Sequence, residues 1–357
     1  MPLQAPSSDR RPPVRPLYRP SLETTMHAIR LHAFGPAENL VYERTETPLP
    51  GPGQVRIAVA AAGVHLLDTA LRQGVAGGPA PLPELPTIPG REVAGTVDAL
   101  GEGTDPAWLG RRVVAHLGMN PGGYAEQAVV HAEKLHEIPG NLDEAQAVAM
   151  IGTGRTTMGI LGFTDLTADD VALVPAAAGG IGSLLVQYAK NVGATVIGLA
   201  GGPAKVERVR KLGADLAVDY TNAGWPSVVR AFLAVRALPG ATVVFDSVGG
   251  EPGRAAVGLL ARGGQHLVFG WSSGVPLEFA EGELAERGIT SESVLGPVML
   301  AKAGGDNPMR TLETASLAEA AAGRLVPDVQ RFPLAEAAAA HRALETRGTM
   351  GKVVLIP

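Results

Sequence analysis

The sequence of 357 residues contains no cysteine. This absence excludes disulfide bonds, cysteine nucleophiles, and zinc or iron–sulfur sites with cysteine ligands. Aromatic residues make up only 4% of the chain, and its formal net charge is -5. A chain with few rings to stack on bases and no excess of basic residues is not typical of a nucleic-acid-binding protein.

Long apolar runs are also lacking. No stretch approaches the about 18 apolar residues of a transmembrane helix, and the N-terminus has no apolar core of a signal peptide. Residues 1–25 are rich in proline and arginine and are expected to form a disordered leader. We therefore expect a cytoplasmic protein with no membrane or nucleic-acid partner, built from roughly two domains of about 150 residues each.

The most informative feature that is present is a glycine-rich turn. A short apolar run at residues 171–174 leads into small residues at 176–182 and then into a helix-like segment at 183–190. Glycines between a buried strand and a helix let the backbone approach a pyrophosphate, whose charge the helix N-terminus stabilises. The segment predicts a dinucleotide-binding site.

The residues after the next strand indicate which dinucleotide. That apolar run, residues 194–200, ends about 20 residues after the turn, where NAD-binding proteins place an acidic residue on the ribose 2′-hydroxyl. The chain instead has Gly201 and Gly202, followed by Lys205. Small residues leave room for a 2′-phosphate and a cation can neutralise it, so NADPH is favoured over NADH. The remaining cations of this segment are expected on a solvated helix face: Arg208, Arg210 and Lys211.

The organisation of the chain changes near residue 143. Before it, short strand-like runs such as 28–31, 54–59 and 112–115 are separated by Gly and Pro, which indicates a compact, mostly β domain. After it, helical segments alternate with strand-like runs at 171–174, 194–200, 215–220, 241–246 and 265–270. This alternation predicts an α/β fold with a doubly wound parallel sheet. The final run, 351–356, is expected to return to the first domain.

These segments, in this order, resemble the medium-chain dehydrogenase/reductase superfamily, and within it the zinc-free quinone oxidoreductases. The segments that support the resemblance are residues 63–68, 89–97, 122–126, 176–182, 246–250 and 351–355. The resemblance implies a GroES-like catalytic domain formed by residues 26–150 and 296–357. It also implies a Rossmann NADPH-binding domain formed by residues 151–295.

The resemblance further implies a set of cofactor-binding residues. Lys205 and Tyr220 would hold the adenosine 2′-phosphate end, while Phe269 and Gly270 would lie near the nicotinamide. Arg347 matches a cofactor-contacting position. The residues implied to line the pyrophosphate are Ala178, Gly179, Gly180, Ile181 and Gly182. Tyr220 could instead be a strand-end aromatic and Arg347 a solvated charge.

His65 and Thr156 are the candidate catalytic residues. His65 stands where the relatives usually carry Asn, and it could donate a hydrogen bond to a substrate carbonyl or be a satisfied structural histidine. Thr156 matches a cofactor-contacting position but could be an ordinary helix-surface hydroxyl. Arg91 replaces a histidine that binds zinc in the zinc alcohol dehydrogenases, and Glu92 is expected to form an ion pair with an arginine.

The predicted function is a zinc-independent, NADPH-dependent reductase that transfers hydride to a quinone or an α,β-unsaturated carbonyl. The cofactor carries the hard chemistry, and the protein must orient it and stabilise the developing oxyanion. Two alternatives stay open: an enoyl reductase acting on acyl or natural-product intermediates, and an NADPH-binding sensor or structural protein without turnover. A small-molecule substrate is expected, and a homodimer is possible.

Overall fold

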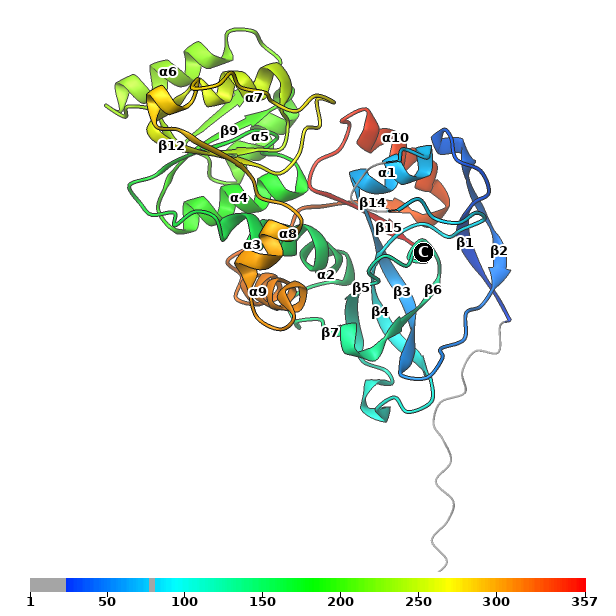
Figure 1. Cartoon of the computed structure of the whole chain (residues 1–357). Coiled ribbons are helices and arrows are strands. Elements are labelled where there is room, and N and C mark those ends of the chain that lie inside the picture. The colour runs from blue at the N-terminus through cyan, green and yellow to red at the C-terminus, as the bar shows by residue number, and fades with distance from the viewer. Residues whose placement is uncertain (1–23, 77–80) are drawn as a thin grey trace, which may run out of the picture.

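The computed structural model describes residues 24–76 and 81–357. The predicted disordered leader therefore lies almost wholly outside the described residues. The chain forms two lobes (Figure 1): one combines the N-terminal strands with the C-terminal segment, and the other holds the middle of the chain. No helix in the described ranges is both long and apolar enough to cross a membrane.

The first lobe is built on a seven-stranded sheet. Its order is β14-β15-β3-β4-β5-β7, and β6 also pairs with β3. The strands are β3 (Gln54–Val64), β4 (Glu92–Leu100), β5 (Arg112–His116), β6 (Gln127–His131), β7 (His136–Glu137), β14 (Val329–Pro333) and β15 (Lys352–Ile356). A separate hairpin, β1 (Thr25–Leu31) and β2 (Leu40–Glu46), and the helices α1 (Leu66–Gln73) and α10 (Ala337–Glu345) complete the lobe.

The last strand returns to this first lobe, as predicted. β15 runs antiparallel to β3, with Val354 opposite Gly63. β4 flanks β3 on its other side, with Val93 opposite Ala62. One strand, β3, therefore separates β15 from β4, the strand that begins at Glu92.

The second lobe is a six-stranded parallel sheet in the order β10-β9-β8-β11-β12-β13. This is the doubly wound order in which strand sequence reverses at the centre, and ligands bind at the carboxyl ends of the strands there. The strands are β8 (Val171–Val174), β9 (Thr195–Ala200), β10 (Leu216–Asp219), β11 (Ala241–Asp246), β12 (Leu260–Val268) and β13 (Thr290–Ser293). The helices are α4 (Gly180–Asn191), α5 (Pro203–Lys211), α6 (Trp225–Val235) and α7 (Gly250–Val257).

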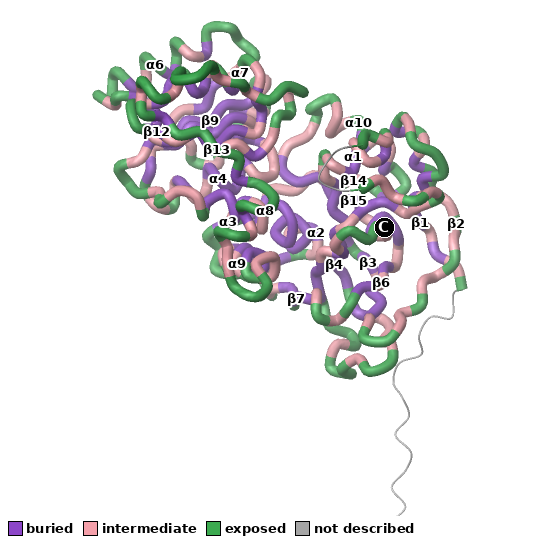
Figure 2. Tube along the Cα trace, in the orientation of Figure 1, coloured by how far each residue is buried: buried purple, intermediate pink, exposed green. Residues whose placement is uncertain are grey.

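The predicted strands of this sheet are confirmed, with two differences. β12 begins at Leu260, earlier than the apolar run indicates. β13 was not predicted, because its residues are polar and all of them are exposed. Figure 2 shows buried residues concentrated along the strands of both lobes, which is where the apolar runs of the sequence lie.

Five helices join the lobes. They are α2 (Glu144–Ala149), the π-helix η4 (Met150–Gly154), α3 (Arg155–Leu161), α8 (Pro297–Ala303) and α9 (Pro308–Ala321). Ser316 of α9 donates a hydrogen bond to the Met150 carbonyl at 2.7 Å, and Leu317 packs in one core with Leu184 of α4. Residues 297–321 therefore lie at the junction, and the proposed domain bounds stay a prediction. The 3₁₀ helices are η1 (Ala37–Asn39), η2 (Pro106–Trp108), η3 (Ala132–Lys134), η5 (Ala285–Arg287) and η6 (Leu334–Glu336).

Candidate functional site

The residues at the start of β15 connect the glycine-rich turn to the first lobe. The Gly351 N–H donates to the Ala178 carbonyl at 2.8 Å, and Gly351 forms an isolated bridge with Gly179. A Cβ at Gly351 would lie 2.4 Å from the Asp328 carbonyl oxygen, and its φ of +65° also favours glycine. The next residue, Lys352, reaches into the first lobe, so turn and lobe are joined by adjacent residues.

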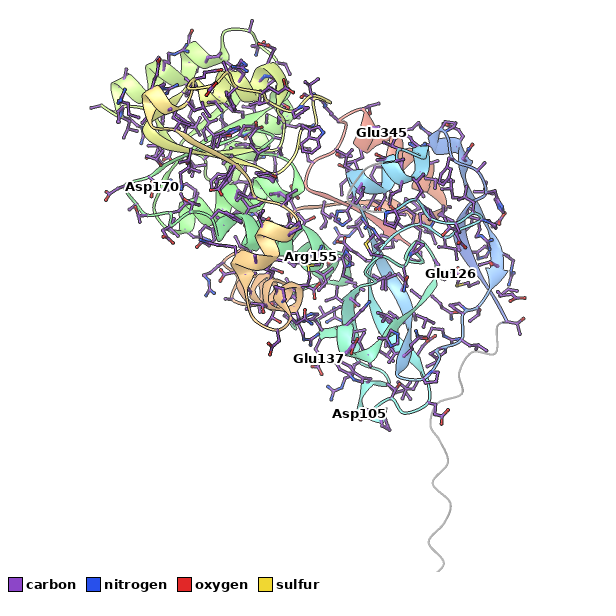
Figure 3. The ribbon with its side chains drawn as sticks, in the orientation of Figure 1. Asp105, Glu126, Glu137, Arg155, Asp170 and Glu345 are labelled. Atoms are coloured by element: carbon purple, nitrogen blue, oxygen red, sulfur yellow. The ribbon has the colours of Figure 1, made fainter. Side chains whose placement is uncertain are left out.

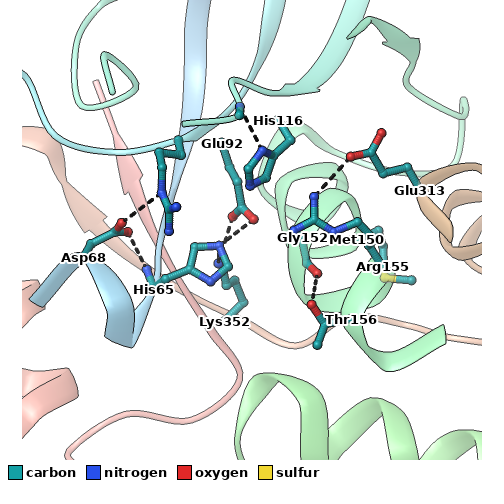
Figure 4. Close-up of polar contacts among 12 residues, drawn as sticks. His65, Asp68, Glu92, His116, Met150, Gly152, Arg155, Thr156, Glu313 and Lys352 are labelled. Carbon is teal, nitrogen blue, oxygen red and sulfur yellow. Dashed lines mark hydrogen bonds and ion pairs between the residues drawn. The ribbon is translucent and has the colours of Figure 1, made fainter. Parts of the chain in front are cut away.

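Lys352 belongs to a polar cluster with His65 and Glu92, which we call the His65 cluster (Figure 4). Its Nζ lies 2.8 Å from Glu92 Oε2 and 2.9 Å from His65 Nε2. His65 Nε2 lies 2.5 Å from Glu92 Oε1. The side-chain exposures of Lys352 and Glu92 are 4% and 0%, whereas that of His65 is 26%. His65 is therefore the member of the cluster that a ligand could reach.

Glu92 stays ionised in this buried position. Burial alone would raise the pKa of its carboxyl, but the charges of His65 and Lys352 outweigh burial and hold that pKa well below its usual range. Two glycines make room for the carboxylate. A Cβ at Gly63 would lie 2.2 Å from Oε2, and one at Gly152 would lie 1.4 Å from Oε1. The expected ion pair between Glu92 and an arginine was wrong, because Lys352 and His65 occupy that position.

Asp68 fixes the backbone that presents His65. Its Oδ2 accepts the His65 backbone N–H at 2.8 Å and the Tyr124 hydroxyl at 3.1 Å. The Tyr124 oxygen also lies 3.2 Å from Nε2 of buried His341. Burial, with the nearby Asp68 charge, raises the Tyr124 pKa well above its usual value. His65 therefore stands on an ordered helix start, since α1 begins at the following residue.

Two further basic residues, His116 and Arg91, lie beside the cluster. Burial, followed by the charge of Arg155, lowers the pKa of His116 to about 3. The His116 Nδ1 accepts the Gly118 N–H at 3.0 Å, which suits a neutral ring. Arg91 Nε lies 3.7 Å from Asp68 Oδ1. Among the described residues, no group of three or more His, Cys, Asp or Glu side chains is arranged to hold a metal ion.

The glycine turn leaves open space at Gly179. Its φ is -78°, which any residue can adopt, and a Cβ there would meet only the Ala176 carbonyl, at 3.2 Å. Gly179 precedes the 12-residue helix α4, and within the described ranges no side chain caps that end. The free N–H groups and the open space suit a bound pyrophosphate.

The other turn residues differ in their surroundings. A Cβ at Gly182 would lie 2.4 Å from the Ala176 carbonyl oxygen, so this glycine permits close packing of helix on strand. A Cβ at Gly180 would meet Thr153 at 3.0 Å. Ala178 is buried, whereas Ile181 is half-buried. Gly179 is thus the position of the turn where added atoms would enter open space.

Lys205, Tyr220 and Arg347 come together beside the end of β9. Lys205 Nζ donates to the Arg347 carbonyl at 2.6 Å, and burial followed by the Arg347 charge lowers the Lys205 pKa. Burial raises the Tyr220 pKa, and Arg347 is close enough to oppose that rise. Asp219, at the end of β10, is engaged by Thr221 and by the Gly202 N–H. Two cations and a phenol therefore gather at one point.

The remaining predicted residues are placed less directly. The Phe269 side chain is buried in the core of the second lobe, so its backbone and Gly270 are what border the strand end. The Thr156 hydroxyl donates to the Gly152 carbonyl at 3.0 Å, as a helix-surface hydroxyl does (Figure 4). The roles of these residues stay predictions.

The sequence assigned no role to Lys352 or Asp68. Lys352 lies in a segment that carries the family resemblance, but nothing local indicates its partners. Arg155, labelled at the lobe junction in Figure 3, was also not predicted; it donates to Glu313 at 3.2 Å. Apart from the local contact of Asp68 with the His65 N–H, these three residues acquire their surroundings from contacts between distant segments.

Two family models match the chain. The alcohol dehydrogenase GroES-like domain matches residues 51–140, and the zinc-binding dehydrogenase model matches residues 180–302. A 2-haloacrylate reductase of Burkholderia sp is 34% identical over 92% of this chain and 98% of its own length. A quinone oxidoreductase of Pseudomonas aeruginosa is 33% identical over 92% of this chain and 99% of its own length.

A solved structure with a similar fold also belongs to a quinone oxidoreductase. The crystal structure of Escherichia coli quinone oxidoreductase complexed with NADPH is 28% identical to this chain, with a TM-score of 0.79. The match covers 93% of this chain and all of that one. Together with the parallel-sheet lobe, the GroES-like lobe and the ordered motifs, these matches show that the chain belongs to the zinc-free quinone oxidoreductase group of the medium-chain dehydrogenase/reductase superfamily.

Proposed function

We propose that the protein is an NADPH-dependent, zinc-independent reductase acting on a quinone or on the carbon–carbon double bond of an α,β-unsaturated carbonyl compound. The observation that carries the proposal is the junction at Gly351 and Lys352. One residue bonds to the glycine turn and the next to His65. A cofactor on the turn would therefore extend toward the one partly exposed member of the His65 cluster.

The chain offers residues for each part of the cofactor. Gly179 and the start of α4 suit the pyrophosphate, while Lys205 and Arg347 suit the charge of a 2′-phosphate. When bound, NADPH supplies the hydride. The relatives named for NADPH, quinones and 2-haloacrylate support this choice of cofactor and substrate class.

His65 is suited to hold and release a proton at Nδ1. When Nε2 carries a proton it can donate to Glu92, and when it does not it can accept from Lys352. Nε2 therefore has a partner whether or not it carries a proton. A proton at Nδ1 can stabilise the negative charge that develops on a substrate carbonyl oxygen.

The test is NADPH oxidation with a panel of quinones and α,β-unsaturated carbonyl compounds. We expect turnover by the wild type and a drop in kcat of about a hundredfold or more in His65→Phe, since positioned acid–base groups contribute 10²–10⁴-fold. His32→Gln is the matched control. His32 is an exposed histidine directly after β1, and its ring pairs with Glu43. No oxidation with any compound would leave the sensor or structural role in place of the reductase.

The panel also separates the enzymatic alternatives. Turnover confined to thioesters of long acyl chains would favour an enoyl reductase. A wild-type rate matched by His65→Phe would refute the role of the cluster while leaving the reductase itself intact. Both outcomes are read from the same initial-rate measurements.

A second copy of the chain could bind at β13. This strand pairs with β12 on one side, ends the sheet, and has four exposed residues. An exposed edge strand carries unpaired N–H and C=O groups that can pair with another chain. Sedimentation equilibrium of the wild type, compared with Ser293→Pro, tests this homodimer. The N–H of Val294 donates to Val268 of β12, so the N–H of the preceding residue, Ser293, faces the free edge.

A further inference from the structure

Arg91 is a partly buried arginine whose guanidinium has few protein partners. Its side chain is 11% exposed, and its Nε is buried with no partner among the described residues. Its polar contact is the 3.7 Å approach to Asp68, which is longer than a hydrogen bond. Two nearby arginines make more contacts, although the Nε of Arg72 also lacks a partner: Arg72 donates to the Gly35 carbonyl and pairs with Glu345, labelled in Figure 3, and Arg155 donates to Glu313.

Keeping the Arg91 guanidinium largely out of water with few acceptors costs the protein free energy. A guanidinium has five donors and cannot lose its charge, so removing it from water without acceptors is unfavourable. Asp68 compensates it only in part, because the 3.7 Å between Arg91 Nε and Asp68 Oδ1 is too long for a hydrogen bond. Arg91 therefore retains a demand for an anion.

Arg91 also lines a cavity. The cavity has a volume of about 170 Å³, smaller than the ~300–1,000 Å³ of pockets for drug-sized ligands. Its charged lining consists of Asp68, Arg72 and Arg91, and because Arg72 is paired with Glu345, Arg91 is the lining cation whose only nearby counterion is the more distant Asp68. The rest of the wall is mainly apolar: Leu31, Leu71, Leu82, Pro89, Met119 and Pro121.

The cavity adjoins the His65 cluster. Asp68 lines the cavity and also accepts the His65 backbone N–H at 2.8 Å. Arg91 is followed directly in the chain by Glu92, whose carboxylate holds the His65 ring at 2.5 Å. A ligand on Arg91 would thus lie beside the proposed reaction centre.

We propose that the substrate carries a carboxylate that binds Arg91, and that it is a short 2-enoic acid rather than a neutral quinone. This inference rests on the proposed reductase function and specifies its substrate class. A guanidinium binds a carboxylate through two parallel hydrogen bonds, which fixes orientation as well as charge. The small, mainly apolar cavity accommodates the few carbon or halogen atoms of such an acid.

The reaction of such a substrate balances as follows. Bound NADPH would supply a hydride to C3, and the electron pair of the C2–C3 double bond would move onto the carboxylate. The resulting enediolate would take a proton from water at C2, giving the saturated acid, with NADP+ and hydroxide as the other products. Arg91 opposes the second negative charge that develops on the carboxylate oxygens, so its attraction increases as the reaction proceeds.

The first experiment compares 2-chloroacrylate with its methyl ester as substrates. We expect the wild type to prefer the acid in kcat/KM by at least tenfold. Arg91→Leu should lower this acid-to-ester ratio by tenfold or more, and Arg91→Lys, which keeps the charge but loses the planar fork, should lie between them. Arg112→Leu is the matched control, because Arg112 is exposed, pairs with Glu144, and lies away from the cavity; its ratio should equal that of the wild type.

The second experiment measures binding without turnover. Calorimetry with 2-chloropropanoate and with its neutral amide should give at least tenfold tighter binding of the acid to the wild type, and this difference should be lost in Arg91→Leu. Thermal unfolding of each variant identifies any that fails to fold, in which case Arg91→Lys carries the comparison.

The outcomes separate the two proposals. If the wild type reduces quinones or the ester as well as it reduces the acid, and binds acid and amide equally, the carboxylate inference is overturned while the reductase stands. If the acid binds through Arg91 but no compound oxidises NADPH, the reductase proposal fails and the anion site stands. An acid preference that survives in Arg91→Leu would place the anion elsewhere.

Discussion

Replacing Lys352 by methionine tests whether charge holds the His65 cluster together. The Lys352 ammonium and the Glu92 carboxylate are 2.8 Å apart, and their side chains are 4% and 0% exposed. Removing one partner of such a pair leaves a buried charge without its counterion, which typically costs about 3–5 kcal/mol. His65 still lies 2.5 Å from the carboxylate, so we expect the lower end of this range.

A double-mutant cycle isolates the pair. Lys352→Met and Glu92→Gln are measured singly and together by denaturant unfolding at pH 7. Since the double variant leaves neither charge unpaired, we expect it to be more stable than the sum of the single losses predicts, by about 1–3 kcal/mol. Arg112→Met is the control, because Arg112 and Glu144 are also 2.8 Å apart but exposed by 41% and 27%, and it should cost no more than about 1 kcal/mol.

The pH dependence of the same cycle has a defined sign. The pKa of Glu92 is held below its usual value in the folded protein, so the pair contributes stability above the ordinary carboxyl pKa of 4.5. That contribution is lost as the pH falls through the folded-state pKa. The wild type should therefore lose its advantage over Lys352→Met at acidic pH. Additive losses, or a single variant within about 1 kcal/mol of the wild type at pH 7, would refute the reasoning.

Three other predictions concern the second lobe and the buried histidine. His116→Asn, whose amide oxygen can still accept the Gly118 N–H, should reduce the dependence of unfolding free energy on pH by up to about 1.4 kcal/mol per unit. This change is expected between pH 6.5 and about 3, because the pKa of His116 in the folded protein is lowered to about 3 and the unfolded chain binds the extra proton over this range. An unchanged dependence of the unfolding free energy on pH would contradict a neutral His116 ring. Gly179→Val should keep the wild-type melting temperature but weaken NADPH binding at least tenfold, or about 1.4 kcal/mol. Gly182→Val, in contrast, should lower the free energy of unfolding by about 1–3 kcal/mol because the added side chain overpacks the turn. Normal NADPH affinity in a folded Gly179→Val protein would show that the cofactor does not bind at this turn. By fluorescence titration the wild type should bind NADPH at least tenfold more tightly than NADH, about 1.4 kcal/mol, and Lys205→Ala should reduce that preference; equal wild-type affinities would contradict it.

The elements that could be predicted from the sequence are those with local signals. The apolar run of β8 and the small residues after it predicted both the strand and the start of α4, because a buried parallel strand and its turn have a continuous signature. β13 has no such signature. Its four residues are polar and exposed, and pairing with β12 alone makes it a strand.

The His65 cluster shows why the site was only partly predicted. His65 was identified from its position, but its partners come from strands far apart in the chain. The register of β15 on β3 brings Val354 opposite Gly63, and that of β3 on β4 brings Ala62 opposite Val93. Only this pairing carries Lys352 to Glu92, so no local pattern could have selected a lysine over the arginine that charge alone suggested.

The same geometry explains why the cofactor turn and the polar cluster act as one unit. Residue 351 must be glycine because its φ is positive and an added Cβ would collide with the Asp328 carbonyl. The Gly351 N–H donates to the carbonyl of Ala178. Lys352 follows immediately and holds His65. A shift of the turn would therefore move the Lys352 backbone and disturb a buried ion pair, which costs several kcal/mol. The turn is fixed relative to His65 by the same strand that neutralises Glu92, and the hydride transfer that we propose would require this positional accuracy between cofactor and substrate.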